Sequence, residues 1–340
     1  MIELNNDRLV FTFPDVHPQA RLAIDFQRTL RIPDDNKNYP LPPGLGSFPI
    51  RHVDDFEKSV PARWLQHGGV MLPMYQSEAM WLRFQTYNVT GQGIYPFAIK
   101  IAAGKINAVS GEAWKKRLSL KPQDYVVAPG QPWLDGFCVE EGIIRQFVAM
   151  PLGLGVTAEE QLAGKAEHGG LQIMAYPMKR KVFEKRFPVI RGYGQIRFSM
   201  GDGPMACCES PGMGLAPGGR MKQEIYEDPF DLKDWDMEQS SRCFVHICNS
   251  QIWRQITGEQ PPTVPPTAKE YSRAGLPWFD YYSEGSKPIP GAKRLKKLKS
   301  SAAMQKKTRP LLPENEPVNP GKVVLLRAGL KADQVREWAE

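Results

Sequence analysis

The chain has 340 residues, of which 41% are hydrophobic and 24% are charged, so it contains enough apolar material for one large domain or two ordinary ones. Its 31 prolines and 30 glycines favour turns and extended loops over long helices. No apolar run approaches the roughly 20 residues of a membrane-spanning helix, and the N-terminal residues lack the basic and apolar regions of a secretory signal.

The cysteines do not suggest a disulfide framework, because their number is odd and no export signal accompanies them. They are Cys138, Cys207, Cys208, Cys243 and Cys248. We expect small buried side chains or free thiols in a cytoplasmic protein without a membrane span.

The net charge of +7 comes from one segment of the chain. Eight lysine and arginine residues lie between Lys293 and Arg309 without an acidic residue among them, and subtracting these eight charges from +7 leaves −1 for the rest. Any weak contact with a polyanion therefore belongs to this segment. Because no aromatic residues are interleaved with the basic ones, specific recognition of single-stranded nucleic acid is not indicated, and a solvated linker is the alternative interpretation.

Strands and two short helices are predicted in the first part of the chain. Strands are expected at residues 9–13 and at residues 21–27, where apolar and polar side chains alternate. A helix can begin near Asp54, and a second one is predicted over residues 76–84. Two apolar stretches around an Ala-Ala-Gly turn predict a hairpin within residues 95–110.

Further strands and two helices follow. The strands are predicted at residues 124–128, 143–150, 171–176, 195–200, 222–226 and 242–248. Thr157 and Glu160 have the spacing of a capping box, so a helix is predicted over residues 157–166. Another helix is predicted over residues 249–257, with Gly258 at its end.

These elements predict a body of the α+β class over residues 1–284. We expect it to be strand-rich, a mainly antiparallel sheet or barrel with few short helices and long Pro/Gly loops. Residues 285–320, rich in Pro, Lys and Ser, predict a flexible basic linker. Residues 321–340 predict a C-terminal strand-helix element, which docks either on its own body or on a partner.

One pattern occurs twice in the chain. Residues 42–46 read P-P-G-L-G and precede H-G-G at residues 67–69, whereas residues 151–155 read P-L-G-L-G and precede H-G-G at residues 168–170. A duplicated unit would place two equivalent loops around a common centre. Chance recurrence in a chain rich in Gly and Pro is the alternative.

The candidate catalytic residues are grouped around two histidines. His168 follows Glu167 in a loop that enters a strand, where a neighbouring carboxylate can hold an imidazole that titrates near neutral pH. His67 precedes the first glycine pair, and Asp135 and Arg145 complete the candidate set. If the two loops met, they would form a site; otherwise each histidine only bridges its own turn.

Two kinds of loop are candidate ligand-binding sites. The glycine-rich stretch over residues 201–220 can bind an anion through backbone amides, with Gly218, Gly219 and Arg220 as the candidate residues, although a plain connection is the alternative. Trp133 and Trp278 lie in loops with proline, where an aromatic ring can stack on a ligand or plug the open end of a sheet.

No metal and no cofactor are predicted. Cys243, His246 and Cys248 suggest a metal site at first sight, but on a strand Cys243 faces the opposite side from the other two residues. No second pair of ligands with the spacing of a structural zinc site occurs in the chain.

The sequence favours a non-enzymatic binding or assembly protein. Its aromatic loops or its C-terminal element would engage a protein partner or a second copy of the chain. The alternative is a hydrolase or transferase with an acid–base site centred on His168 and Glu167. The two hypotheses differ in whether His67, His168 and Asp135 converge, and the sequence leaves open whether the protein is an enzyme.

Overall fold

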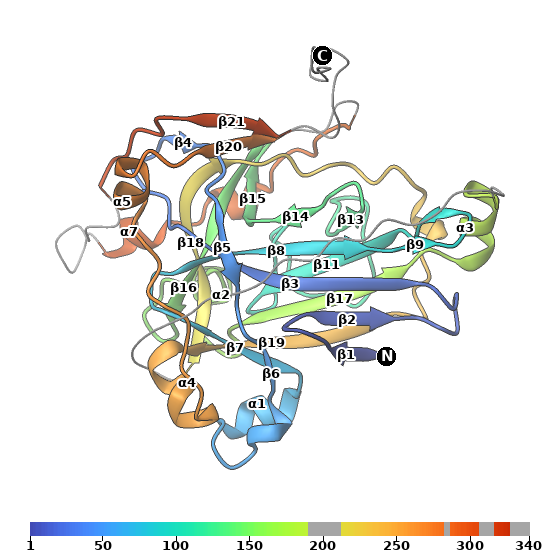
Figure 1. The fold of residues 1–340 in the computed structure, drawn as a ribbon, viewed down its shortest axis with the longest axis horizontal. Helices are drawn as coiled ribbons and strands as arrows, with labels where there is room; N and C mark the ends of the chain where they lie inside the picture. The colour runs from blue at the N-terminus through green and yellow to red at the C-terminus, as the bar shows by residue number, and fades with distance from the viewer. Residues whose placement is uncertain (190–211, 282–285, 306–315, 327–340) are drawn as a thin grey trace, which may run out of the picture.

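Strands dominate the computed structural model, which describes residues 1–189, 212–281, 286–305 and 316–326 (Figure 1). The strands are β1 (Ile2–Leu4), β2 (Leu9–Thr12), β3 (Arg21–Thr29), β4 (Asn38–Tyr39), β5 (Gly44–Ser47), β6 (Arg51–His52), β7 (Val70–Met74), β8 (Ala79–Thr86), β9 (Asn88–Val89), β10 (Gly93–Ile94), β11 (Phe97–Ala103), β12 (Ile106–Asn107), β13 (Val126–Ala128), β14 (Trp133–Leu134), β15 (Gly136–Glu140), β16 (Ile143–Pro151), β17 (Leu171–Pro177), β18 (Gly212–Lys222), β19 (Ser241–Asn249), β20 (Trp278–Tyr281) and β21 (Val323–Leu326). The predicted strand at residues 195–200, the adjacent Cys207 and Cys208, and the C-terminal part of the predicted strand-helix element lie outside the described residues.

The helices are few and short, and the strand-rich α+β fold expected from the sequence is confirmed. They are α1 (Ala62–His67), α2 (Ala158–Ala163), α3 (Arg180–Arg186), α4 (Ser250–Thr257), α5 (Ala268–Arg273), α6 (Lys293–Lys296) and α7 (Ser301–Gln305), with 3₁₀ turns η1 (Asp54–Phe56) and η2 (Leu232–Asp234). The predicted capping box starts α2, because the Thr157 side chain accepts from the backbone N–H of Glu160 and the Glu160 side chain accepts from that of Thr157. Gly258 ends α4 in the left-handed conformation, with φ 74°, as the sequence predicted.

Seventeen of the described strands hydrogen-bond into one sheet. An antiparallel path runs through it in the order β1, β2, β3, β8, β16, β18, β19, β17, β11 and β13. β4 joins β18 and β7 joins β19 as parallel strands. β19 therefore has β7 along one edge and both β17 and β18 along the other, an arrangement that positions the site described below.

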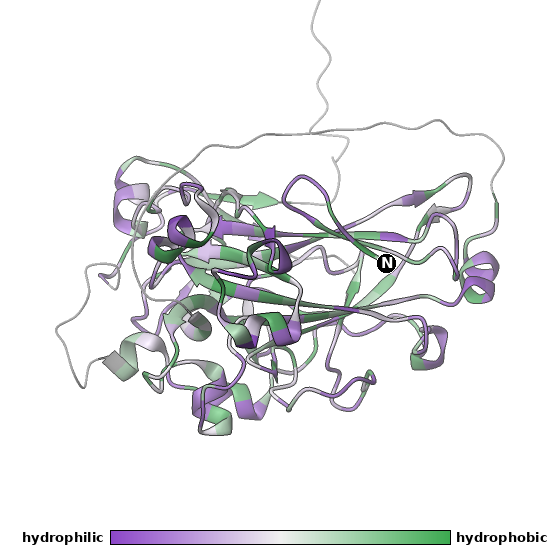
Figure 2. Cartoon of the chain, turned by 90° about the horizontal axis from the view of Figure 1, so that it is seen from below, coloured by the Kyte–Doolittle hydropathy of each residue, from purple (hydrophilic) through white to green (hydrophobic). Residues whose placement is uncertain are grey.

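The apolar core lies inside this folded sheet. Seen from below, the strands form two layers (Figure 2). One continuous cluster of buried apolar side chains joins them, and Phe13, which follows β2, contacts Phe97 of β11 with ring centroids 5.6 Å apart. Burial of each large side chain of this kind contributes about 1.5–3 kcal/mol.

Residues 79–86 form strand β8, so the helix predicted over residues 76–84 was wrong. Leu82 and Phe84 are buried and alternate with half-buried residues, which is the period of a strand. Leu82 lies opposite Phe26 of β3. The apolar run is too short for its sequence alone to distinguish a helix from a strand, and pairing with β3 decides it.

Residues 212–220 were expected to be part of a glycine-rich loop, but residues 212–222 form the long, mostly buried strand β18. Its glycines allow other chain segments to approach. A Cβ atom at Gly218 would lie 2.5 Å from Cγ2 of Val148, and one at Gly219 would lie 2.4 Å from the carbonyl oxygen of Pro33. Of the next predicted strand, over residues 222–226, only its first residue lies in a strand.

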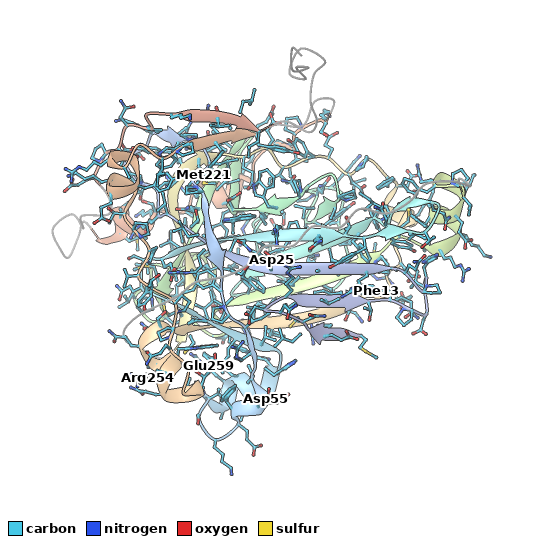
Figure 3. All side chains as sticks on the ribbon, viewed as in Figure 1. Phe13, Asp25, Asp55, Met221, Arg254 and Glu259 are labelled. Carbon is cyan, nitrogen blue, oxygen red and sulfur yellow. The ribbon has the colours of Figure 1, made fainter. Side chains whose placement is uncertain are left out.

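A charged residue lies in the middle of β3. Asp25 is labelled on this strand in Figure 3, and its side chain has no exposed surface. Its Oδ2 is 2.9 Å from Nη2 of Arg83, which occupies the opposite position on β8. Because a buried carboxylate is stable only when it is paired, this cross-strand contact explains how a core strand contains an aspartate.

Part of the predicted linker over residues 285–320 is folded against the body. Residues of α6 and of the following turn contribute buried side chains, including Leu295 and Leu298. Leu295 packs on Gly111, where a Cβ atom would lie 2.9 Å from Cγ of the leucine. The basic composition of this segment concealed the regularly spaced leucines that anchor it.

Some of the basic residues in this segment have acidic partners. Arg294 lies 3.0 Å from Glu112 and Lys296 lies 3.1 Å from Glu140. The last three of the eight, Lys306, Lys307 and Arg309, lie outside the described residues. The charge available for a polyanion is therefore smaller than the sequence suggests.

The described strand of the C-terminal element contacts the body of its own chain. β21 pairs in parallel with β20, with Val323 opposite Trp278, and the two strands lie together at the edge of the molecule (Figure 1). Docking on the body was one of the two alternatives left open by the sequence.

Candidate functional site

The two H-G-G segments meet across strand β19. The first enters β7 and the second enters β17, and the residues that follow the glycines, Val70 and Leu171, both lie opposite Val245. β7 runs parallel to β19 and β17 runs antiparallel to it, so the two segments approach the same point from opposite edges. The residues before the glycines, His67 and His168, are thereby brought together.

Gly69 and Gly170 allow this close approach. Gly69 has φ 91°, and a Cβ atom there would lie 2.3 Å from the carbonyl oxygen of Phe244. Gly170 has φ 51°, and a Cβ atom there would lie 2.3 Å from the carbonyl oxygen of Val245. Since neither the backbone angle nor the space suits a side chain, each histidine is followed by the only residue type that fits.

Five rings form a cluster over β19. The ring of His67 is parallel to that of Phe244, with centroids 4.6 Å apart and an interplanar angle of 12°. It lies 6.0 Å from the ring of His168. Trp64 stacks on His246 at 4.9 Å. Because Trp64 and His67 are one turn apart on α1, and Phe244 and His246 are two residues apart on β19, each pair points to the same side.

The His168 loop is held by Glu159, a residue that we did not predict from the sequence. The buried Glu159 carboxylate accepts hydrogen bonds from the backbone N–H groups of Glu167, His168 and Gly169, at 3.0, 2.8 and 2.8 Å. Glu159 lies in the first turn of α2, so the predicted capping box also determines where its side chain points. The capping box predicted from the sequence, which contains the neighbouring Glu160, could have pointed to Glu159.

His168 is half-buried, with 22% of its side chain exposed. Its Nε2 lies 3.8 Å from Oε2 of Glu167, and its Nδ1 is buried without a hydrogen-bond partner among the described residues. A buried N–H without an acceptor is costly. We therefore assign the neutral form with its proton on Nε2, toward Glu167.

Burial and nearby cations favour the neutral form of both histidines. Burial lowers the pKa of His67 and of His168 below the ordinary value of 6.5, and the charge of Lys105 lowers both further. Lys105 Nζ and Arg242 Cζ lie 6.0 and 5.5 Å from the centre of the Phe244 ring. Within the part of the chain that the structure describes, neither cation forms an ion pair, so their charge faces the site and solvent.

His246 supports the site from below. Its side chain is buried and its Nε2 lies 3.0 Å from the carbonyl oxygen of Gly68, which is an acceptor, so Nε2 carries a proton. Burial lowers the pKa of His246 to about 4, so the ring is neutral at physiological pH. Cys243 and Cys248 are buried free thiols, and no group of three or more His, Cys, Asp or Glu side chains among the described residues is arranged to hold a metal.

The structure does not bring Asp135 and Arg145 to the histidines. Asp135 is buried between β14 and β15, where its Oδ2 accepts a hydrogen bond of 2.7 Å from Nε2 of Gln223. Burial raises the pKa of Asp135 to about 8. Nη1 of Arg145 lies 3.3 Å from Asp34 and donates to the carbonyl oxygen of Gly218 at 2.9 Å. Both residues hold the sheet together.

The candidate anion-binding residues are likewise in other roles. Gly218 and Gly219 lie within strand β18. Arg220 donates to both carboxylate oxygens of Glu140, at 3.2 and 2.8 Å, and to Oδ1 of Asn38 at 2.9 Å. Its guanidinium group is therefore already engaged.

The two candidate aromatic residues pack against the protein. Trp278 is fully buried, and its ring contacts Tyr39 and Tyr271 at 6.2 Å. Trp133 is half-buried and lies 4.6 Å from Tyr281 and 6.3 Å from Trp81. Both residues were expected in loops, but Trp133 is the first residue of β14 and Trp278 is the first residue of β20, because each stretch pairs with a neighbouring strand.

Comparisons with protein-family models, curated proteins and solved structures found no match. In the described ranges, no helix is long and apolar enough to cross a membrane. Function is therefore inferred from the site alone. An imidazole at the end of α1 and one in the loop before β17 can accept and donate protons on either side of a reacting group, and the two cations can attract a negatively charged one.

Proposed function

We propose that the protein is a hydrolase or transferase that acts on an anionic substrate by acid–base chemistry at His67 and His168. The observation that carries the proposal is the 6.0 Å separation of these two rings, which come from segments far apart in the sequence. A structural role for each histidine in its own turn does not require the two to meet. Lys105 and Arg242 support an anionic substrate, because they lie beside the rings without ion-pair partners among the described residues.

The proposed reaction uses one histidine in each protonation state. The neutral imidazole accepts a proton from water, or from an alcohol in transfer, as the oxygen bonds to the electrophilic centre. The other histidine, as imidazolium, donates its proton to the leaving oxygen as the bond to that oxygen breaks. The two histidines end with exchanged protonation states, and exchange of protons with solvent restores them.

A panel of p-nitrophenyl compounds tests this proposal: the phosphate monoester, the bis-phosphate diester, the sulfate and the uncharged acetate. We expect turnover of an anionic ester that falls about 100-fold or more in His67→Asn and in His168→Asn, the range that general acid–base catalysis supplies. His52→Asn is the matched control, since His52 lies opposite Val70 on the neighbouring strand β6 but is exposed and is not one of the five rings. Equal activity in all three variants, or no turnover above buffer for any ester, would rule the proposal out.

Assembly through the C-terminal strand is a second candidate function. Val323, Leu325 and Leu326 are 46%, 37% and 39% exposed on β21, and an exposed apolar edge strand is a template for another strand. We propose that Leu325→Lys would shift an assembly toward monomer in light scattering. Leu154→Lys, at a leucine that is 57% exposed elsewhere, is the control. A monomeric wild-type protein at all concentrations would remove this candidate as self-association.

A further inference from the structure

A cleft separate from the histidine site opens between residues 109–112, 120–123 and 289–294, with Glu227 and Asp228 also in its lining. Its volume is about 680 Å³, within the range of roughly 300–1,000 Å³ that is typical of small-molecule sites. No residue of the ring cluster over β19 lines it.

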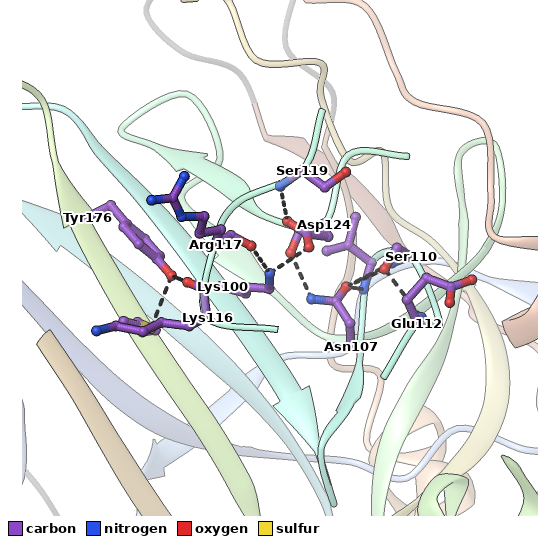
Figure 4. Close-up of polar contacts among 11 residues, drawn as sticks. Lys100, Asn107, Ser110, Glu112, Lys116, Arg117, Ser119, Asp124 and Tyr176 are labelled. Carbon is purple, nitrogen blue, oxygen red and sulfur yellow. Dashed lines mark hydrogen bonds and ion pairs between the residues drawn. The ribbon is translucent and has the colours of Figure 1, made fainter. Parts of the chain in front are cut away.

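Two walls of the cleft are held in place by one buried polar network (Figure 4). The Asn107 side chain accepts from the backbone N–H of Ser110 at 2.8 Å and donates to the carbonyl oxygen of Asp124 at 2.7 Å. The Asp124 carboxylate in turn accepts from Lys100 Nζ at 2.5 Å and from the backbone N–H of Ser119 at 2.9 Å. The loops that carry residues 109–112 and 120–123 are therefore fixed to a common anchor.

The third wall is fixed to the body as well. The backbone N–H of Ile289 donates to Ile225 at 2.7 Å and that of Ala292 donates to Cys138 at 2.9 Å. Leu295, just beyond this wall, is fully buried. Because all three walls are anchored, the cleft is preformed, and a ligand need not order it on binding.

The acidic residues of the cleft already have partners. Glu112 pairs with Arg294 at 3.0 Å, and Glu227 pairs with Lys287 at 2.6 Å. Asp228 accepts from the hydroxyl group of Tyr125 at 2.5 Å and from Nε1 of a buried tryptophan at 2.7 Å. None of the three carboxylates is left as the natural partner of a ligand cation.

Unlike these acids, two lysines of the cleft have no charged partner among the described residues. Lys121 and Lys293 are exposed, belong to different walls, and form no ion pair within the described part of the chain. Apolar groups line the space between them, among them Val109, Leu120 and Ile289. Leu120 is 39% exposed. The cleft thus combines an apolar interior with unneutralised positive charge at its rim.

We infer that the cleft binds an amphipathic organic anion, a small molecule with an apolar body and one carboxylate, sulfonate or phosphate group. The apolar body lies against Val109, Leu120 and Ile289, and the anionic group lies between Lys121 and Lys293. A cationic ligand is disfavoured because the acids are already paired, and an uncharged one gains nothing from the lysines.

Fluorescence titration with 8-anilinonaphthalene-1-sulfonate tests this inference on the full chain, with the uncharged N-phenyl-1-naphthylamine as a second probe. We expect saturable binding of the sulfonate that weakens about tenfold in the Lys121→Glu/Lys293→Glu double variant, with little change for the uncharged probe. Lys297→Glu is the matched control, because Lys297 follows α6 but does not line the cleft. Ala292→Trp should weaken both probes by filling the space.

Equal weakening by Lys297→Glu would overturn the inference, because a general loss of charge would then explain the effect. Unchanged binding in the double variant or in Ala292→Trp would also overturn it, as would failure of both dodecanoate and 1-naphthoate to displace the bound sulfonate. Circular dichroism and a thermal midpoint for each variant separate lost binding from lost folding. The histidine variants should bind the sulfonate as the wild type does, so the two sites succeed or fail independently.

Discussion

Gly69 and Gly170 contact neighbouring carbonyl groups of β19 from opposite edges, those of Phe244 and Val245. Each would place a Cβ atom 2.3 Å from its carbonyl oxygen. This relationship explains why His67 and His168 occupy the same place over the sheet: each histidine precedes a glycine pair that has to pass close to the same strand. The recurrence of H-G-G in the sequence thus has a common physical cause at both positions, whether or not the segments arose by duplication.

Gly170→Ala should destabilise the protein by about 2–5 kcal/mol, because the new methyl group meets a strand carbonyl and the backbone has positive φ. Gly164→Ala is the matched control. Its φ is 77° and a Cβ atom there meets nothing within 4 Å, so only the conformational cost of about 1 kcal/mol applies. Urea unfolding measures both, and equal losses would show that the contact with β19 does not matter.

Glu159→Gln should release the His168 loop. The amide replaces one of the carboxylate oxygens that accept from three backbone N–H groups, so we expect a loss of about 2–4 kcal/mol from charge-assisted hydrogen bonds. Hydrogen exchange of residues 167–169 should accelerate more than that of β17. Glu141→Gln, at an exposed acid, should change neither quantity. Unchanged exchange at residues 167–169 would contradict the anchoring role of Glu159.

Part of this site could be predicted from the sequence and part could not. The two histidines, the capping box of α2 and the end of α4 depend on neighbouring residues, and local patterns identified them. That Val70 and Leu171 share Val245 depends on strand pairing between distant segments, which no local pattern contains. From the sequence alone we could say only that the two histidines would form a site if their loops met.

The predictions that were wrong also depended on contacts between segments far apart in the sequence. Glycines in residues 212–222 were interpreted as a loop signal, whereas in β18 they make room for neighbouring chain segments. Asp135 was a candidate catalytic partner of His168, but its buried carboxyl group instead bonds to Gln223. Lys105, Arg242 and Phe244 were not chosen, since their importance comes from contacts with one another across strands.

Lys105→Gln should raise the pKa of both His67 and His168, because the lysine charge helps to keep them neutral. NMR titration of the histidine ring protons measures the change directly, without a substrate. The difference from wild type should shrink in 0.5 M salt, which shortens the Debye length to less than about 8 Å. Lys297→Gln is the control, and identical titration curves in wild type and Lys105→Gln would show that the lysine does not act on the rings.

If the two histidines act as acid and base, the pH dependence of turnover should follow the same shifts. Both pKa values are lowered, so the bell-shaped profile should lie on the acidic side of an unperturbed histidine pair. In Lys105→Gln the profile should move to higher pH together with the pKa values from NMR. Movement of the NMR values without movement of the profile would separate the imidazoles from the reaction.

Asp135→Asn should make the protein more stable in alkaline solution. The pKa of Asp135 is raised from 3.8 to about 8 by burial, so the folded protein holds a proton there that the unfolded chain releases. The free energy of unfolding of the wild type therefore falls as pH rises through this window, by at most about 1.4 kcal/mol per pH unit from this group. Asparagine keeps an oxygen for Gln223 and does not titrate, so the variant should lose less stability with pH.

Urea unfolding at pH 5, 7 and 9 measures this difference. We expect the free energy of unfolding of Asp135→Asn to rise relative to that of the wild type at each higher pH. At pH 9 it should exceed the wild-type value by about 1–3 kcal/mol. Asp55→Asn is the control, because Asp55 lies in η1 (Figure 3), is exposed, and its substitution should leave the pH dependence unchanged. Parallel curves for wild type and Asp135→Asn would mean that Asp135 is ionised in the folded protein, and burial beside Gln223 would then have to stabilise a charge.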